Sequence, residues 1–127
     1  MHYLLTCDAV AMGPDGAKPT YYGVFTGVSA QAFPCTVATM TVAWSMRTAE
    51  PCVLRLRLVS PTGEVLHDLD AAKVSATRDV MVSGYNTITQ EQFPEPGEYR
   101  FELLSGDQVV GSTPVFVSIR GEDTSHG

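Results

Sequence analysis

Apolar and polar side chains alternate with a period of two along most of the chain. Between residues 52 and 59, three leucines fall on one side of the backbone and two arginines fall on the other. Successive side chains of a strand point to opposite faces of a sheet, so this alternation predicts a half-buried β-strand. The same period recurs around Trp44, in residues 98–104 and in residues 114–120. Strands therefore dominate the expected structure.

The pattern predicts eight or nine short strands separated by turns rich in Pro and Gly. Their approximate bounds are residues 2–11, 20–30, 36–46, 52–60, 64–68, 79–90, 98–104, 107–111 and 114–120. No ten-residue segment has the apolar stripe of a helix, although 68–74 could form one helical turn with Asp68 or Asp70 as its N-cap. Many short strands at this spacing predict an all-β fold, a two-sheet antiparallel β-sandwich of the immunoglobulin-like kind. We expect one such domain over residues 1–120 and a polar tail at 121–127.

The clearest strands also predict the core and a possible sheet edge. Residues expected to be largely buried are Trp44, Leu54, Leu56, Leu58, Tyr99, Phe101 and Val117. The stretch 36–43 carries no charge, no Pro and no Gly. It is either a central strand or an unprotected edge that pairs with a second copy. The sequence thus leaves a monomer and a homodimer open.

Several segments together resemble a known family. The chain opens with Leu4-Leu5-Thr6-Cys7-Asp8-Ala9-Val10, continues through Tyr21-Tyr22-Gly23-Val24-Phe25 and Phe33-Pro34, and carries Pro96-Gly97-Glu98-Tyr99-Arg100-Phe101 near its end. It resembles a family of small bacterial β-sandwich proteins of unknown function, whose members begin with an apolar-apolar-Ala-Asp stretch and end with a Pro-Gly-x-Tyr-x-Phe strand. Here Cys7 stands where members often have Ala. The resemblance implies a fold and carries no activity with it.

Composition excludes several classes of partner. Eight basic against fourteen acidic side chains give a net charge of −6. Nucleic acids and anionic membranes require clustered Lys and Arg. The chain is acidic overall and has only two lysines, Lys18 and Lys73, so we expect neither as a partner. No apolar run approaches the ~20 residues that span a bilayer, and residues 1–8 lack the features of a secretory signal. We expect a soluble protein of the cytoplasm.

Candidate chemistry is sparse. Cys7, Cys35 and Cys52 are too far apart in sequence for a zinc or redox motif, so we expect three reduced thiols, each acting as a small apolar residue. His67, Asp68 and Asp70 could form a metal corner or a histidine base oriented by a carboxylate, although the sequence favours a polar strand end with an N-cap. Calcium would need Asp68 and Asp70 to meet further aspartates of the chain at one end of the sandwich. We expect no metal and no cofactor.

Asp8 follows an apolar strand and precedes another apolar stretch, so part of its surroundings should be dry. Buried carboxylates find donors, so we expect Asp8 to accept backbone N–H bonds or to pair with Arg55, Arg57 or Arg100. Asp8, His67, Asp68 and Asp70 are the candidate functional surface.

The sequence favours a non-enzymatic module that binds a protein partner or acts as a scaffold. A sandwich that binds a small molecule or a carbohydrate through Tyr21, Tyr22, Trp44 and Tyr85 is an alternative, because aromatic rings stack on sugars. A hydrolase with an unrecognised site is a second alternative. It would require a deep pocket that holds His67 and a nucleophile.

Overall fold

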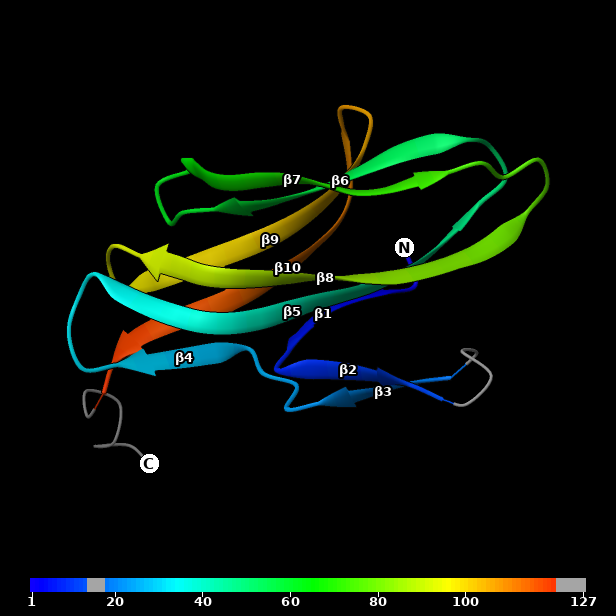
Figure 1. Ribbon diagram of the computed structural model, residues 1–127. Coiled ribbons are helices and arrows are strands. Elements are labelled where there is room, and N and C mark those ends of the chain that lie inside the picture. Colours follow the sequence, from blue (N-terminus) through cyan, green and yellow to red (C-terminus); the bar gives the residue numbers. More distant parts are fainter. Residues whose placement is uncertain (14–17, 121–127) are drawn as a thin grey trace.

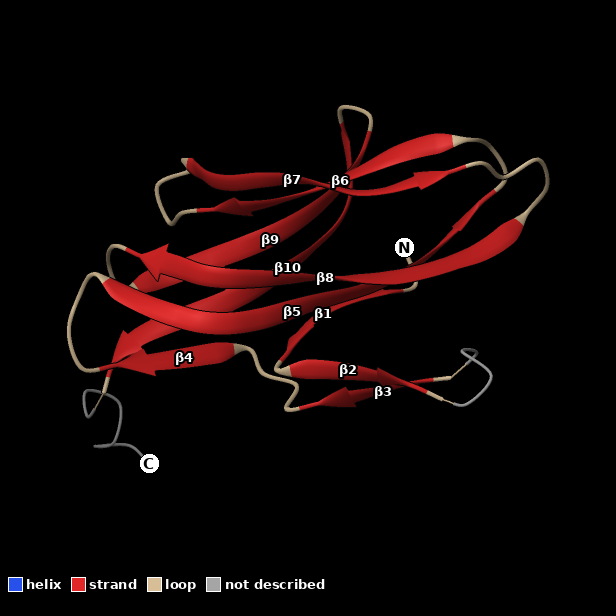
Figure 2. Ribbon diagram, in the orientation of Figure 1, coloured by secondary structure: helices blue, strands red, loops and turns tan. Residues whose placement is uncertain are grey.

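Strands form almost the whole of the structure, a computed structural model that describes residues 1–13 and 18–120. No helix occurs within these two ranges, as Figure 2 shows. The ten strands are β1 (Tyr3–Cys7), β2 (Ala9–Met12), β3 (Pro19–Tyr22), β4 (Gly27–Ala30), β5 (Cys35–Thr48), β6 (Cys52–Val59), β7 (Val65–Val74), β8 (Val80–Phe93), β9 (Gly97–Ser105) and β10 (Gln108–Ile119). The predicted all-β class is confirmed.

The strands form three sheets (Figure 1). A three-stranded sheet has the order β1-β5-β8, a five-stranded sheet has the order β4-β10-β9-β6-β7, and β2 and β3 form a two-stranded sheet. All neighbouring strands are antiparallel except β4 and β10, which are parallel. The expectation of antiparallel pairing throughout is therefore wrong at this edge of the five-stranded sheet.

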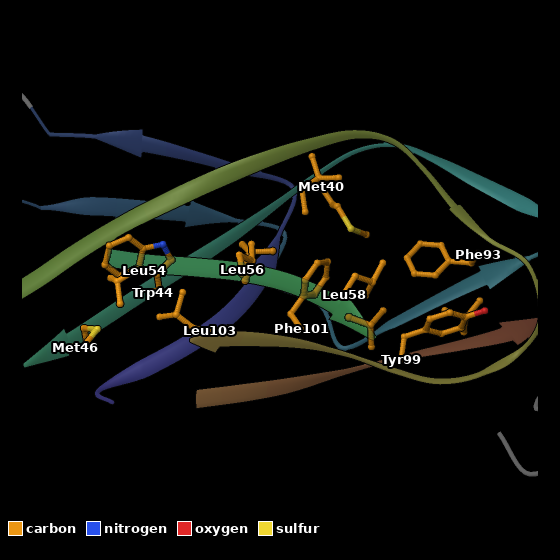
Figure 3. Close-up of a cluster of buried hydrophobic side chains, with 14 of the residues drawn as sticks. Met40, Trp44, Met46, Leu54, Leu56, Leu58, Phe93, Tyr99, Phe101 and Leu103 are labelled. Atoms are coloured by element: carbon orange, nitrogen blue, oxygen red, sulfur yellow. The ribbon is translucent and has the colours of Figure 1, made fainter. Parts of the chain in front are cut away.

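One apolar core joins the two larger sheets (Figure 3). It combines Met40, Val42, Trp44 and Met46 of β5 with three leucines of β6 and with Tyr99, Phe101 and Leu103 of β9. Each of the seven residues predicted to be in the core is at most 3% exposed. Apolar burial is the main favourable term in folding, so this cluster is what holds the two sheets together.

Three expectations about strand bounds and one about a helical turn are corrected by the structure. The strand expected at 2–11 divides at Asp8, and the one expected at 20–30 divides after Tyr22, where Gly23 adopts a positive φ of 64°. The last two predicted strands are one strand, β10, with a bulge near Val109. The helical turn expected at 68–74 is wrong, because this segment belongs to β7 and pairs with β6 along its length. Pairing with a neighbouring strand overrides the weak local preference for a turn.

The alternation of inward and outward side chains reverses near the C-terminal end of β8. Gln90 has a φ of 55°, a left-handed conformation that is uncommon for residues other than Gly. Ile88 before it and Glu91 and Phe93 after it are all buried, so the inward positions change from even to odd residue numbers. Ala38 of β5, which lies between the pairs Val37–Glu91 and Thr39–Thr89, is exposed.

A buried tyrosine fastens the turn between β8 and β9. The Tyr99 hydroxyl donates to the Glu95 carbonyl at 2.6 Å and accepts from the Glu95 N–H at 3.1 Å, and the side chain is fully buried. Its ring packs edge-on against Phe93, with ring centroids 4.9 Å apart. The tyrosine therefore fixes the path by which the chain passes from the three-stranded to the five-stranded sheet.

Replacing this hydroxyl should lower stability. We expect Tyr99→Phe to reduce the free energy of unfolding by about 1–3 kcal/mol, because it leaves a backbone donor and acceptor without their partner. Urea unfolding measures the change. Tyr85→Phe is the matched control, since Tyr85 is 47% exposed. Equal stabilities of the two variants would show that the hydroxyl of Tyr99 contributes nothing.

No helix of the described residues has the length and the apolar character needed to cross a bilayer. The predicted tail at 121–127 and residues 14–17 of the loop before β3 lie outside the described residues.

Candidate functional site

The first half of β5 has a partner strand on one side only. Residues 41–45 pair with both β1 and β8, whereas residues 35–40 face β8 alone among the described strands. The β1 ladder stops at the pair Cys7–Thr41, and the chain then turns away at Asp8 into β2. Within the stretch 36–43, residues 41–43 are therefore central, and residues 36–40 form an edge that is open among the described strands. A dimer through all eight residues would have to displace β1.

A cleft of about 370 Å³ lies beside this open half. Its walls come from the turn before β4, from β4 and from β5, and they consist of Asp8, Gly23, Val24, Phe25, Gly27, Val28, Val37 and Thr39. A second cleft of about 470 Å³ shares Val28 and Val37 and extends to Cys35 and Arg120. We call the open edge of residues 35–40 with these two clefts the β4–β5 groove. Among the described residues, Asp8 and Arg120 are the only charged ones that line it, and they belong to different clefts.

The loop at Gly23 is bonded to the backbone of Asp8 and leaves space for the Asp8 side chain. The Asp8 N–H donates to the carbonyls of Tyr22 at 2.9 Å and Gly23 at 3.2 Å, which fastens the end of β1 to this loop. A Cβ on Gly23 would lie 2.1 Å from the Asp8 carboxylate oxygen Oδ2. A side chain at position 23 would therefore move the carboxylate from its place at the cleft.

The surroundings of Asp8 differ from those predicted. The residue is exposed, and none of the three candidate arginines contacts it. Arg55 pairs with Asp68, Arg57 pairs with Glu102 at 2.9 Å, and Arg100 pairs with Glu98 at 3.3 Å. These pairs lie on the five-stranded sheet, where β6 has glutamate or aspartate neighbours on both sides. No side-chain donor among the described residues bonds the Asp8 carboxylate.

The other candidate residues lie together on β7 but do not form one site. Asp68 contacts Arg55, and Asp70 is exposed opposite the same arginine. The side chain of His67 lies on the opposite face of β7 from that of Asp68. It bonds Glu91 of β8, with 2.8 Å between Nδ1 and Oε1. The carboxylate beside the histidine is thus Glu91, and not Asp68 or Asp70. Within the described residues no three His, Cys, Asp or Glu side chains converge as metal ligands would.

The His67–Glu91 pair joins the two larger sheets at one edge. The Glu91 residue is 8% exposed, and farther along the same two strands the Asn86 amide donates to the Ala71 carbonyl of β7 at 3.4 Å. Both contacts connect β7 to β8, so the His67–Glu91 pair helps to hold the five-stranded and the three-stranded sheet together. The adjoining cleft of about 400 Å³ is lined by Leu66, Gln90, Glu91, Gln92 and Pro94, which include no hydroxyl or thiol nucleophile.

Tyrosines line a smaller cleft of about 250 Å³ between the β2–β3 hairpin and the outer face of the three-stranded sheet. Tyr3 and Tyr21 bond each other through their hydroxyls, and their rings meet at 69° rather than in one plane. Burial, together with the bond to Tyr3, raises the pKa of Tyr21. Trp44 is 2% exposed and belongs to the core, so it cannot serve as a stacking surface. The stacking surface expected from Tyr21, Tyr22, Trp44 and Tyr85 therefore lacks Trp44, whereas Tyr22 and Tyr85 are 54% and 47% exposed.

The three cysteines carry free thiols. Burial raises the pKa of both the Cys7 and the Cys35 thiol, which disfavours the reactive thiolate.

Sequence reasoning pointed to Asp8 but missed the groove beside it. The uncharged stretch 36–43 was the available signal, but which half is open depends on where β1 ends.

Comparisons with known proteins describe the fold more than the site. A family model described as "Family of unknown function (DUF6941)" matches residues 2–118, which confirms the predicted relationship to a family of unknown function. No curated protein matches the chain.

Two solved structures resemble the chain weakly. One is the Pseudomonas fluorescens alkylpurine DNA glycosylase AlkC bound to DNA containing an abasic site analog, with a TM-score of 0.49, 9% identity, and coverage of 92% of this chain and 31% of that chain. The other is a β-glucosidase from Listeria innocua, with a TM-score of 0.46, 13% identity, and coverage of 91% of this chain and 16% of that chain. The chain spans less than a third of the length of either protein. Likenesses this weak carry no argument about function.

Proposed function

Since the chain belongs to the family of unknown function DUF6941, we propose a function from its geometry: a non-enzymatic module that binds a protein partner by adding a strand of that partner to the open half of β5. The single observation that carries this proposal is the edge of residues 35–40, which has no partner strand beyond β8 among the described residues. Free backbone N–H and C=O groups at a strand edge bind extended peptides, and neighbouring pockets take the alternate side chains.

The scaffold that we propose for this module is an immunoglobulin-like sandwich made of the two larger sheets. Three features support this interpretation. The edge strand β4 is parallel to β10, the orders β1-β5-β8 and β4-β10-β9-β6-β7 divide the strands between two layers, and Tyr99 bonds the backbone four residues upstream at the start of β9. A tyrosine at this corner is typical of immunoglobulin-like folds.

The groove is suited to an extended polypeptide. Thr36, Ala38 and Thr39 are exposed, so an incoming strand can reach the edge of β5. Phe25, Val28 and Val37 provide an apolar wall for its side chains. A second copy of this chain is a poorer occupant, because two molecules of net charge −6 repel each other. The partner is therefore a different protein, and free thiols support a reducing compartment such as the cytoplasm.

Site-specific photo-crosslinking in the source cell tests this function. A benzophenone amino acid at position 39 should crosslink an extended segment of another protein, identified by mass spectrometry. The same amino acid at the exposed position 77, in the loop after β7, is the matched control and should give no such adduct. Val37→Asp, which places a charge in the groove wall, should abolish the adduct at position 39. An adduct between two copies of the chain, or equal adducts from both positions, would overturn the proposal.

A further inference from the structure

The two ends of the β4–β5 groove carry opposite charges. Asp8 lines the cleft at the point where β1 leaves β5. The other described residues that line this cleft are uncharged. Arg120 lines the far cleft, near Cys35, and its N–H bonds the carbonyl of Ala30 at the end of β4. A strand that occupies the groove therefore has a carboxylate at one end and a guanidinium at the other.

The direction of the added strand follows from that of β1. β1 is antiparallel to β5 and ends opposite Thr41, and Figure 1 shows β5 continuing past this point toward β4. A strand that continues the same ladder begins beside Asp8 and ends opposite Cys35. Its N-terminal residue then faces the carboxylate of Asp8, and its C-terminal residue faces the side of Arg120.

Asp8 is placed to receive a cation. Its carboxylate bonds no side-chain donor of the described residues, and Gly23 leaves the space that it occupies. The apolar wall beside it lowers the local dielectric constant, which strengthens attraction to a charge held there. Fully exposed ion pairs contribute little, so the selectivity comes from a cation seated at the mouth of the cleft rather than one in open solvent.

We propose that Asp8 selects a partner strand that begins with a lysine or an arginine, the basic group lying against its carboxylate. This inference rests on the strand-binding function proposed above and deepens it by naming the chemistry of the partner. Substituting Asp8 should therefore change which peptide binds and should leave the place of binding unchanged.

The experiment uses two capped hexapeptides, acetyl-Lys-Val-Thr-Val-Thr-Val-amide and the same peptide with Glu in first place. Each is titrated into the whole protein, and backbone amide signals are followed by NMR. Both peptides should shift the signals of residues 35–40, and the Lys peptide should bind about tenfold more tightly than the Glu peptide, the difference expected for one charged contact. Asp8→Lys should reverse this preference. Asp107→Lys changes the net charge equally at an exposed turn and should retain it.

The possible outcomes separate the two proposals. Equal affinities of the wild-type protein for the two peptides, with shifts still at residues 35–40, would overturn the role of Asp8 and leave strand binding intact. The absence of shifts at these residues with millimolar peptide would overturn both. A reversal by Asp107→Lys would show that net charge alone is being measured, which would overturn the role of Asp8. A peptide with its lysine in last place should bind like the Glu peptide, and equal binding of the two Lys peptides would overturn the assigned direction.

Discussion

Leu56→Ala should lower the free energy of unfolding by about 2–5 kcal/mol, because the substitution leaves a cavity in the core. Leu56 is 1% exposed at the middle of β6, and β6 pairs with β7 on one side and β9 on the other. Its side chain belongs to the cluster between the two larger sheets. Backbone pairing on both sides limits how far the surrounding strands can collapse into the cavity, which favours a large effect.

Urea denaturation with linear extrapolation measures this loss. Val53→Ala is the control on the same strand, since Val53 is 49% exposed and should change stability by no more than about 0.5 kcal/mol. A loss at position 56 no larger than that at position 53 would mean that the apolar face of β6 does not point into the core.

Gly84→Ala should lower stability by about 1–3 kcal/mol, because the added methyl group overpacks the core. The new Cβ would lie 2.6 Å from Cζ2 of Trp44, which faces Gly84 in the neighbouring strand. The Trp44 ring cannot move freely, since its N–H donates to the Asn86 carbonyl oxygen Oδ1 at 3.1 Å and the residue is 2% exposed. At an uncrowded position the same change would stabilise by restricting the unfolded chain.

Gly27→Ala is the matched control for this prediction. Gly27 also lies in a strand, and its added Cβ would approach only the Phe116 carbonyl oxygen, at 3.4 Å. Thermal unfolding of the two variants should place Gly84→Ala clearly below the wild type and Gly27→Ala close to it. Equal unfolding midpoints of the two variants would show that the Trp44 ring moves aside with no loss of stability.

The candidate site shows how a strand that ends early creates a binding edge. β5 has fourteen residues, whereas β1 has five and covers only the part of β5 from Thr41 to Ser45. The uncovered part lacks the charges, prolines and bulges by which proteins normally protect an edge. An unprotected edge readily pairs with a strand of another chain, and this property supports the proposed function.

The sequence by itself determined the strands whose alternation is strict and whose turns are marked by Pro or Gly. β6 alternates along its length and β9 alternates from Glu98 to Leu103, so the leucines of β6 and the aromatic residues of β9 could be assigned to the core correctly from period alone. Local geometry is sufficient there, because successive side chains of a strand must point to opposite faces.

Only the tertiary structure decided where strands divide, which edges stay open and which charges meet. The division at Asp8 depends on backbone bonds to the loop at Tyr22 and Gly23, fourteen or more residues away. The partner of His67 is Glu91, which faces inward only because Gln90 reverses the alternation of β8. The arginines expected beside Asp8 are held by acids of neighbouring strands. Each of these outcomes depends on strand register across the sheets, which the period of a single strand does not encode.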